Sequence, residues 1–354
     1  MTSTQVLIDD KPQFSPDPAE PLRFLNACPA YRPTPLVKIE DNSGLTLVLK
    51  DETSRLGQRS FKGLGGVYAV AKLIAVAWEK KTGKALQVES LTSEAVRDVA
   101  RSMTFVCASA GNHGLAVAAG ANIFGASARI YLSGDVPNTF EAELSRLGAQ
   151  VIRCGLSYED SMEGAAADVE QTGAILLADS AWAGYTGPPS LIMEGYSVLA
   201  EELRLEFDAM GKWPTDVFLQ AGVGGLAGAA TYMIRKTWTV QPRIFIVEPQ
   251  SAACLQASDK AGYPVRVTGP VSNMGRLDCK EASLIAVEIL RNASVNYITI
   301  ADAAATSAAE FLQSNGLSTT PSGAAGLAGF WQALPTIPRQ KEIRPLIIIS
   351  EGTW

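Results

Sequence analysis

Hydrophobic and polar residues alternate along most of the chain in the manner of parallel strands joined by helices. From Thr104 to about Ala178, the apolar runs TFVCA, ARIYL, QVIRC and AILLA are separated by stretches with helical periodicity. A second series runs from DVFLQAG at 216–222 through RIFIVEP at 243–249 to PLIIIS at 345–350. This pattern predicts an α/β fold with two doubly wound domains.

The first hundred residues add two elements to this scheme. LTLVLKDE at 45–52 predicts a strand, and the apolar stretch from about 61 to 80 predicts a helix. The more polar segment 81–101 lacks a strand pattern, so we expect a helical insertion or a mobile cover there. We expect residues 1–100 and 190–354 to form a large domain, and residues 101–189 to form a small movable one.

Composition limits the class of protein. The chain has 354 residues, of which 47% are hydrophobic and 19% charged, so it can bury a substantial core. Its net charge of −6, without a local Lys/Arg cluster, argues against a nucleic-acid partner. The start is polar and acidic, and no apolar run approaches membrane-spanning length, so we expect no membrane partner and a cytoplasmic location.

Cysteine and histidine usage narrows the chemistry. The five cysteines are odd in number and widely spread, with no CxxC pair, which argues against a disulfide framework or a thiolate zinc site. His113 is the single histidine, which argues against a multi-histidine metal site or a hydrolase that relies on another histidine. We therefore expect no metal site and a chemistry borrowed from a cofactor.

Lys62 is the first candidate for that chemistry. It lies in RSFKGLGG, after a strand and a polar loop and at the opening of an apolar helix. Partial desolvation and the nearby helix N-terminus both disfavour the ammonium form, which favours a nucleophilic amine. The alternative is an ordinary solvated lysine in the first turn, because most lysines are exposed.

A glycine-rich turn, AGVGGLAG at 221–228, directly follows the strand DVFLQ. Glycines at such a turn let backbone N–H groups close on a phosphate, and the helix dipole attracts the anion. Gly222, Gly224 and Ala227 also satisfy a loose dinucleotide fingerprint, with Glu248 where a ribose-binding acid would stand. A nicotinamide dehydrogenase and simple packing of helix on sheet therefore stay open as alternatives.

A second turn of this kind, ASAGNHG at 108–114, is the third candidate element and precedes another expected helix. Backbone N–H groups here can bind a substrate carboxylate, and the Asn112 amide can reach a ring hydroxyl of a cofactor. An ordinary Ser/Asn helix cap is the alternative. His113 can equally serve in packing or capping.

The three elements occur in the order found in fold type II enzymes that use pyridoxal 5'-phosphate (PLP), the tryptophan synthase β group. From about Tyr31 to Gly352 the chain also resembles the diaminopropionate ammonia-lyase family. The segments that carry this resemblance are YRPTPLVKI, KDETSRLGQRSFKGLGGVYAV, DSAWAGY, IMEGYSVL, QAGVGGLAG, VEPQSAACLQAS, SNMGRLDC and SGAAGLAG. The large domain is then the one expected to bind PLP.

The resemblance implies a role for each matching residue. Lys62 would hold PLP as a Schiff base with Phe61 beside it, and Asn112 would contact the ring O3′. Asp179 matches the base that acts on the L-substrate, with a turn cap as the alternative. Ser350 would be a neutral partner of the pyridine nitrogen, which suits β-elimination. The phosphate would be held by Gly222, Val223, Gly224, Gly225 and Leu226, and the substrate by Ser109, Ala110, Gly111 and His113.

Two departures from the family pattern concern the substrate. The family usually reads TDGNHG where this chain has SAGNHG, so Ala110 replaces the acid assigned to the D-isomer. Ala183 replaces a glutamate often found in the family's DTAWEGY segment. Because ASAGNH also resembles threonine and serine dehydratases, we expect either a β-hydroxy amino acid as substrate or only the L-enantiomer of a β-amino one.

The reaction that the resemblance implies is α,β-elimination from a small amino acid, first of all 2,3-diaminopropionate to pyruvate and ammonia. The Cα proton would leave to Asp179 or to the freed Lys62. A threonine, serine or 3-hydroxyaspartate dehydratase is the alternative in the same class, and a catalytically inert PLP-fold binding protein is a further one. The resemblance also implies a homodimer, and we expect the two domains to close over the ligand.

Overall fold

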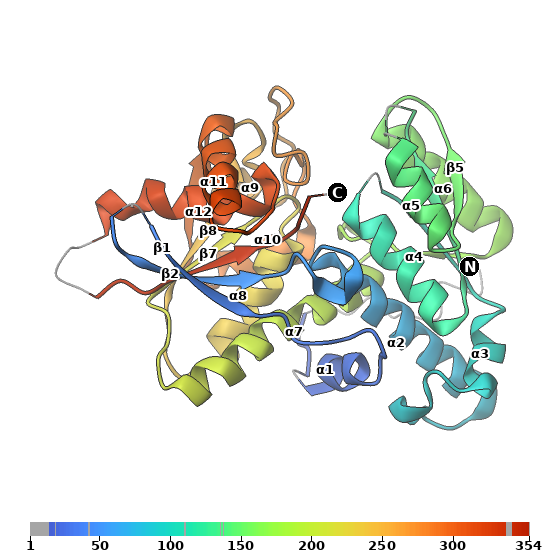
Figure 1. Ribbon diagram of the computed structural model, residues 1–354. Coiled ribbons are helices and arrows are strands. Elements are labelled where there is room, and N and C mark those ends of the chain that lie inside the picture. Colours follow the sequence, from blue (N-terminus) through green and yellow to red (C-terminus); the bar gives the residue numbers. More distant parts are fainter. Residues whose placement is uncertain are drawn as a thin grey trace. The chain divides into compact units, whose positions relative to one another are not determined.

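A computed structural model describes residues 14–17, 19–41, 43–109, 111–134, 136, 138–337 and 342–353. Packing divides the chain into two units (Figure 1). Unit 1 comprises residues 1–32 and 62–195, and unit 2 comprises residues 33–61 and 196–354. The chain thus passes from unit 2 to unit 1 between Phe61 and Lys62, and returns within the long helix α7 (Gly187–Met210).

Unit 1 is built on a four-stranded parallel sheet in the order β5-β4-β3-β6. In β4, Ile130 faces α4 at Gly114, whereas the next residue, Tyr131, faces α6 at Gly164. Successive strand residues point to opposite faces, so α4 and α6 cover the two faces of the sheet. The elements of unit 1 before α7 are α1 (Ala19–Asn26), α2 (Lys62–Thr82), α3 (Glu94–Ala100), β3 (Thr104–Ala108), α4 (Asn112–Phe124), β4 (Ser127–Leu132), α5 (Asn138–Arg146), β5 (Gln150–Arg153), α6 (Tyr158–Thr172) and β6 (Ile175–Leu176).

Unit 2 contains a six-stranded sheet in the order β1-β2-β10-β7-β8-β9. β1 pairs with β2 antiparallel, and the other neighbours pair in parallel. Helices α11 and α12 lie on one face of this sheet, and α8 lies on the other (Figure 1). The elements are β1 (Leu36–Glu40), β2 (Thr46–Asp51), β7 (Asp216–Gln220), α8 (Gly225–Thr237), β8 (Arg243–Pro249), α9 (Cys254–Ala261), α10 (Leu284–Arg291), β9 (Asn296–Ile300), α11 (Asp302–Ser314), α12 (Pro321–Ala333) and β10 (Pro345–Ile349).

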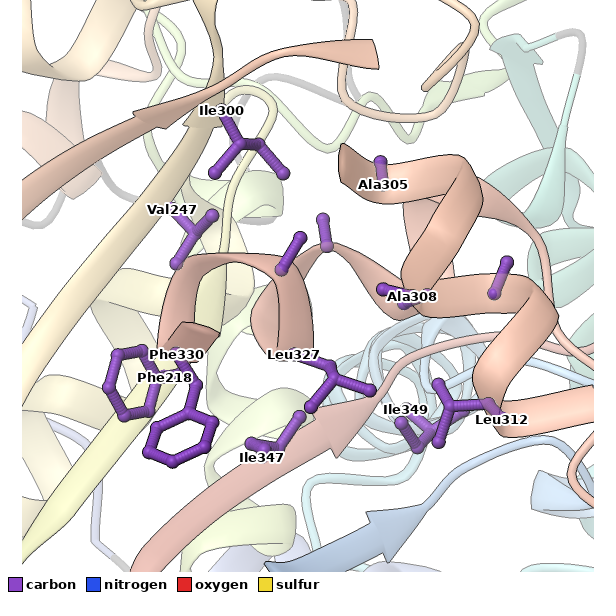
Figure 2. Close-up of a cluster of buried hydrophobic side chains, with 14 of the residues drawn as sticks. Phe218, Val247, Ile300, Ala305, Ala308, Leu312, Leu327, Phe330, Ile347 and Ile349 are labelled. Atoms are coloured by element: carbon purple, nitrogen blue, oxygen red, sulfur yellow. The ribbon is translucent and has the colours of Figure 1, made fainter. Parts of the chain in front are cut away.

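A large hydrophobic core joins α11 and α12 to the sheet of unit 2 (Figure 2). Phe218 stacks on Phe245 with ring centroids 4.7 Å apart, and Phe330 of α12 meets Phe218 edge-on at 5.4 Å. Every residue of β7 and β10 is buried, as is typical of central parallel strands. α12 approaches the sheet so closely that a Cβ on Gly326 would lie 3.3 Å from the side chain of Ile347, which accounts for one of the glycines in SGAAGLAG.

The α/β prediction is confirmed, as is the helix expected at 61–80, which is α2. The segment 81–101 is a helical insertion that contains a short 3-10 turn (Val88–Ser90) and α3. Strands β1 and β9 were not predicted, and both have a largely half-exposed burial pattern with no continuous apolar run. β6 has only two residues of the expected strand AILLA.

Residues 62–100 belong to unit 1 by packing, and the predicted division of the chain into a large and a small movable domain stays a prediction. Helix α2 packs against α4, so residues 62–100 group with the loop around Asn112 and not with the phosphate loop. The physical reason is that α2 and α4 are apolar along most of their length and bury those surfaces together. Movement of residues 101–189 as a body stays a prediction.

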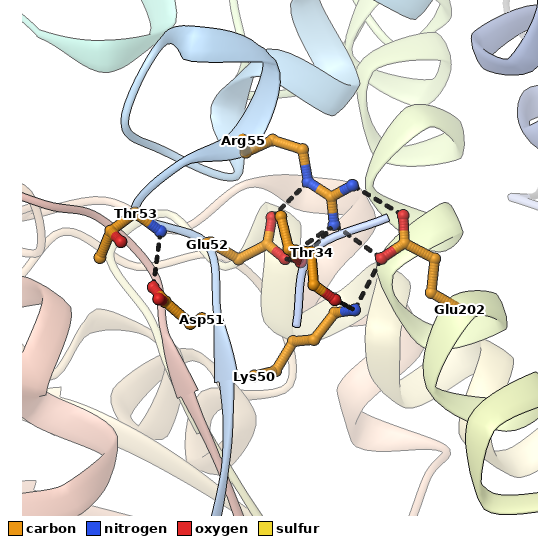
Figure 3. Close-up of polar contacts among 7 residues, drawn as sticks. All are labelled: Thr34, Lys50, Asp51, Glu52, Thr53, Arg55 and Glu202. Carbon is orange, nitrogen blue, oxygen red and sulfur yellow. Dashed lines mark hydrogen bonds and ion pairs between the residues drawn. The ribbon is translucent and has the colours of Figure 1, made fainter. Parts of the chain in front are cut away.

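A network of buried charges lies at the end of β2 in unit 2 (Figure 3). Arg55 donates from Nε and Nη2 to the Glu52 carboxylate, both at 2.7 Å. It also donates from Nη1 and Nη2 to Glu202 of α7, at 2.7 and 2.8 Å. Lys50 Nζ lies 2.7 Å from Glu202 and donates to the Thr34 carbonyl oxygen at 2.6 Å. Two cations thus meet two carboxylates, each at most 5% exposed.

Mutual attraction keeps these groups charged. Burial lowers the pKa of Arg55, but Glu52 and Glu202 outweigh it and raise that pKa above its usual value. Burial likewise raises the pKa of Glu202, whereas Arg55 and Lys50 lower it overall. Removal of one partner would therefore leave an uncompensated buried charge. Because Glu52 and Arg55 lie in the first half of the loop that leads from β2 to Lys62, the network also fixes this half of the loop.

We expect Glu202→Ala to lower the free energy of unfolding by about 3–5 kcal/mol, because Arg55 and Lys50 lose their shared carboxylate. Urea unfolding followed by circular dichroism measures this loss. Glu281→Gln is the control, since the side chains of Glu281 and Arg266 are 4.0 Å apart and both 61% exposed. The control should change the value by less than about 0.5 kcal/mol. Equal effects of the two substitutions would contradict the role assigned to Glu202.

Candidate functional site

Lys62 is the first residue of α2. In the loop before it, Leu56 and Arg59 have φ values of 51° and 57°, which side chains rarely adopt. The end of this loop is tied to the end of β10, because the Phe61 N–H donates to the Ser350 carbonyl oxygen at 3.1 Å. A strained but anchored loop thus precedes the helix that Lys62 begins.

The Lys62 ammonium forms an ion pair with the Asp179 carboxylate within unit 1. The two side chains are 22% and 21% exposed, so water is only partly excluded. Burial raises the pKa of Asp179, but the charge of Lys62, then that of His113, and the hydrogen bond from Lys62 lower it well below its usual range. Asp179 is therefore a carboxylate, able to accept a proton, held directly beside an amine.

Hydrogen bonds fix the backbone just before Asp179. The Tyr185 hydroxyl accepts a hydrogen bond from the Ala178 N–H at 3.0 Å and donates one to the Leu176 carbonyl oxygen at 2.9 Å. His113 Nε2 lies 2.7 Å from the Leu177 carbonyl oxygen, and because a carbonyl only accepts, Nε2 carries the proton. Burial lowers the pKa of His113. The ring predicted to bind substrate therefore also supports the chain that presents Asp179.

The loop around Asn112 precedes α4. Asn112 is the first helical residue and is buried, and the Ser109 hydroxyl accepts a hydrogen bond from the Gly111 N–H at 3.3 Å. Ala110 lies outside the described residues. The first N–H groups of a helix have no acceptor within it and form the positive end of its dipole. The loop is therefore suited to a carboxylate or a phenolate oxygen.

The glycine-rich segment 222–226 follows β7 in unit 2 and includes the first two residues of the 13-residue helix α8. Gly224 has a φ of +98°, and a Cβ there would lie 2.8 Å from the Cβ of Ala286, so a side chain does not fit. The Ser283 N–H donates to the Val223 carbonyl oxygen at 2.9 Å and fixes the loop from outside. The bare turn and the N-terminus of α8 together make a typical phosphate-binding geometry.

Ser350 follows β10 and is 3% exposed. Its Oγ accepts a hydrogen bond from the side-chain amide of Gln220, the last residue of β7, at 3.0 Å. The Phe61 ring meets Tyr196 edge-on, with ring centroids 5.0 Å apart. Gln220 was missed in the sequence, where the available signal was a polar residue at the end of the apolar run DVFLQ.

Glu248, which the dinucleotide alternative required, is a helix cap. Its carboxylate oxygens accept from the Leu255 and Gln256 N–H groups at 2.8 and 2.9 Å, at the start of α9. Burial raises its pKa to about 7, although these two hydrogen bonds oppose the shift. A carboxylate engaged with the chain in this way is not placed to bind ribose hydroxyls.

The predicted site residues thus fall into two groups. Unit 1 holds Lys62, Asp179 and the loop 109–113, and unit 2 holds Phe61, the phosphate loop and Ser350. In the part of the chain that the structure describes, no three His, Cys, Asp or Glu side chains gather as a metal site would require. Within the same residues, no helix is both long and apolar enough to span a bilayer. All five cysteines, which the structure describes, are free thiols.

Comparisons with known proteins show the family and the fold of this chain. A family model described as pyridoxal-phosphate dependent enzyme matches residues 27–349. Diaminopropionate ammonia-lyase from Escherichia coli strain K12 is 35% identical over 306 residues, which are 84% of this chain and 75% of the relative. The crystal structure of the Escherichia coli enzyme with an aminoacrylate-PLP azomethine reaction intermediate matches with a TM-score of 0.80 and 30% identity, over 99% of this chain and 93% of that one. The structure of threonine deaminase isoform 2 from Solanum lycopersicum matches with a TM-score of 0.75 and 18% identity, over 98% of this chain and 93% of that one. This second match shows the same fold.

Glu248 should make the stability of the protein depend on pH. Its pKa rises from an ordinary 4.5 to about 7 on folding, so the folded state holds the proton more tightly and stability falls as pH rises through this range. We expect Glu248→Gln to lack this decline, so that its stability relative to wild type increases by on the order of 2–3 kcal/mol between about pH 4 and pH 8. Urea unfolding at several pH values tests this. A difference that does not change with pH would contradict it.

Proposed function

Since this chain belongs to the diaminopropionate ammonia-lyase family of pyridoxal-phosphate-dependent enzymes, we propose that it converts 2,3-diaminopropionate to pyruvate and ammonia by α,β-elimination. The observation that carries this proposal is the ion pair of Lys62 with Asp179. It sets an amine that can bind an aldehyde beside a carboxylate that can take a proton. An inert binding protein would have no need of such a base.

The residues present fit the cofactor. The Lys62 amine would hold the aldehyde carbon of PLP, and the bare turn before α8 is suited to its phosphate. The Asn112 amide would contact the ring O3′, and the Ser350 hydroxyl would contact the pyridine nitrogen. Bound PLP supplies an electron sink for the electrons left when the Cα–H bond breaks.

Asp179 would take the Cα proton on its carboxylate. While Lys62 carries its positive charge, attraction keeps the pKa of Asp179 low. When the Lys62 amine is engaged or uncharged, this attraction weakens, and burial then raises the pKa of Asp179. The carboxylate thereby becomes a stronger base when the amine is occupied. Because the two groups touch, a freed Lys62 amine can receive the proton from Asp179 or take it directly.

We expect Asp179→Asn to lower kcat for L-2,3-diaminopropionate by about 10²- to 10⁴-fold, because the amide cannot accept the Cα proton. The absorption band of bound PLP should persist, which shows that the cofactor is still held. Asp168→Asn is a matched control: Asp168 is 8% exposed and pairs with Arg129 elsewhere in unit 1, at 2.9 Å. A kcat for Asp179→Asn close to that of the control would contradict the role of Asp179.

The substrate proposal includes its stereochemistry. Ala110 has no carboxylate to act as base toward a D-substrate, so we expect 2-oxo acid release from L-2,3-diaminopropionate and at least about 100-fold less from the D-isomer. Ala110→Asp should raise activity on the D-isomer and leave activity on the L-isomer largely unchanged. The assay includes L-serine, L-threonine and 3-hydroxyaspartate. Activity confined to these hydroxy amino acids would favour the dehydratase alternative and contradict the proposed substrate.

We further propose that the protein acts as a homodimer in the cytoplasm. The homodimer is what the family resemblance implies. The five free thiols are compatible with a reducing compartment, in which cysteines stay unbridged.

A further inference from the structure

Gln220 ends β7 and reaches three acceptors in unit 2. Its amide nitrogen Nε2 lies 2.8 Å from the Ile348 carbonyl oxygen, 3.0 Å from the Gly323 carbonyl oxygen and 3.0 Å from Ser350 Oγ. The side chain is 3% exposed. The polar end of Gln220 therefore lies among the ends of β10 and α12, away from bulk water.

These contacts determine which way the amide faces. A backbone carbonyl can only accept a hydrogen bond, so the atom that faces the Ile348 and Gly323 carbonyl oxygens must be the nitrogen. Ser350 Oγ faces the same nitrogen, which has no lone pair to offer. The nitrogen has two hydrogens for three acceptors, so Ser350 can only accept, and it shares one N–H with a carbonyl oxygen. Its own hydroxyl hydrogen is left for a different acceptor.

The glutamine stabilises the fold through its amide nitrogen but carries a cost at its carbonyl oxygen. Its carbonyl oxygen Oε1 is buried and has no hydrogen-bond partner among the described residues, which is energetically unfavourable. The backbone of α12 lies against that oxygen, since a Cβ on Gly326 would be 3.0 Å from it. An apolar side chain of similar length would avoid the buried oxygen but would lose the contact with Ser350 together with those to the Ile348 and Gly323 carbonyl oxygens.

We propose that Gln220 is a positioning residue that keeps the Ser350 hydroxyl as a hydrogen-bond donor toward the pyridine nitrogen of PLP. This inference rests on the proposed function, in which Ser350 contacts that nitrogen. A hydroxyl that donates requires a nitrogen with a free lone pair, so Gln220 also favours the unprotonated ring that suits β-elimination. Without Gln220 the hydroxyl can rotate, and the donated hydrogen bond is lost for part of the time.

The test uses holoenzyme reconstituted with PLP that carries ¹⁵N in its ring, and it follows the ring nitrogen by NMR. We expect Gln220→Met to move the ¹⁵N signal toward that of a pyridine nitrogen without a hydrogen bond, in the same direction as Ser350→Ala. The affinity of the apoprotein for PLP should fall by about threefold to tenfold, as expected for one lost hydrogen bond. Leu219→Met, a volume-conserving change next to Gln220 on β7, should leave the signal where it is in wild type.

The outcomes separate this inference from the function on which it rests. If Ser350→Ala moves the signal and Gln220→Met does not, the role of Gln220 is wrong and the contact of Ser350 stands. If neither moves it, the contact proposed for Ser350 is wrong, and the role of Gln220 falls with it. Should Gln220→Met fail to fold, Gln220→Asn keeps an amide but withdraws it by one methylene, and it should move the signal in the same direction.

Discussion

The ion pairs of Arg55 with Glu52 and Glu202 are the interactions that fix the loop before Lys62. Glu52 and Glu202 hold both edges of the guanidinium, so the start of the loop that follows β2 has one arrangement. Its other end is tied to β10 through Phe61, and the strained backbone between them persists because both ends are fixed. Buried ion pairs contribute little net stability but can specify one geometry, and here that geometry is the conformation of the loop before Lys62.

Different neighbours set the pKa of Asp179 and hold its backbone in place. The charge of Lys62 sets how strongly Asp179 holds a proton, whereas Tyr185 and the His113 ring hold the chain before Asp179 through hydrogen bonds. A base held in this way can change its proton affinity without moving. Gln220 extends the same principle to Ser350, since an amide fixed by two carbonyl groups determines which way a hydroxyl donates.

The sequence was most informative where a single residue type or a local hydrophobic period determines the structure. The apolar strands, the helix after Lys62 and the order of lysine, Asn112 loop and glycine turn were all predictable, because each rests on local pattern. β1 and β9 were not, since their half-exposed residues show neither a continuous apolar run nor a clear alternation. The partnership of Arg55 with Glu202 and that of Gln220 with Ser350 join residues far apart in the chain, so only folding reveals them.

Reduction of the holoenzyme with borohydride tests most directly whether Lys62 holds PLP. The reduced bond survives proteolysis, so mass spectrometry of the peptides locates the pyridoxyl group. We predict that the group is found on the peptide that contains Lys62 and on no other. A pyridoxyl group on a different lysine, or none on any peptide of an enzyme that carries PLP, would contradict this role of Lys62.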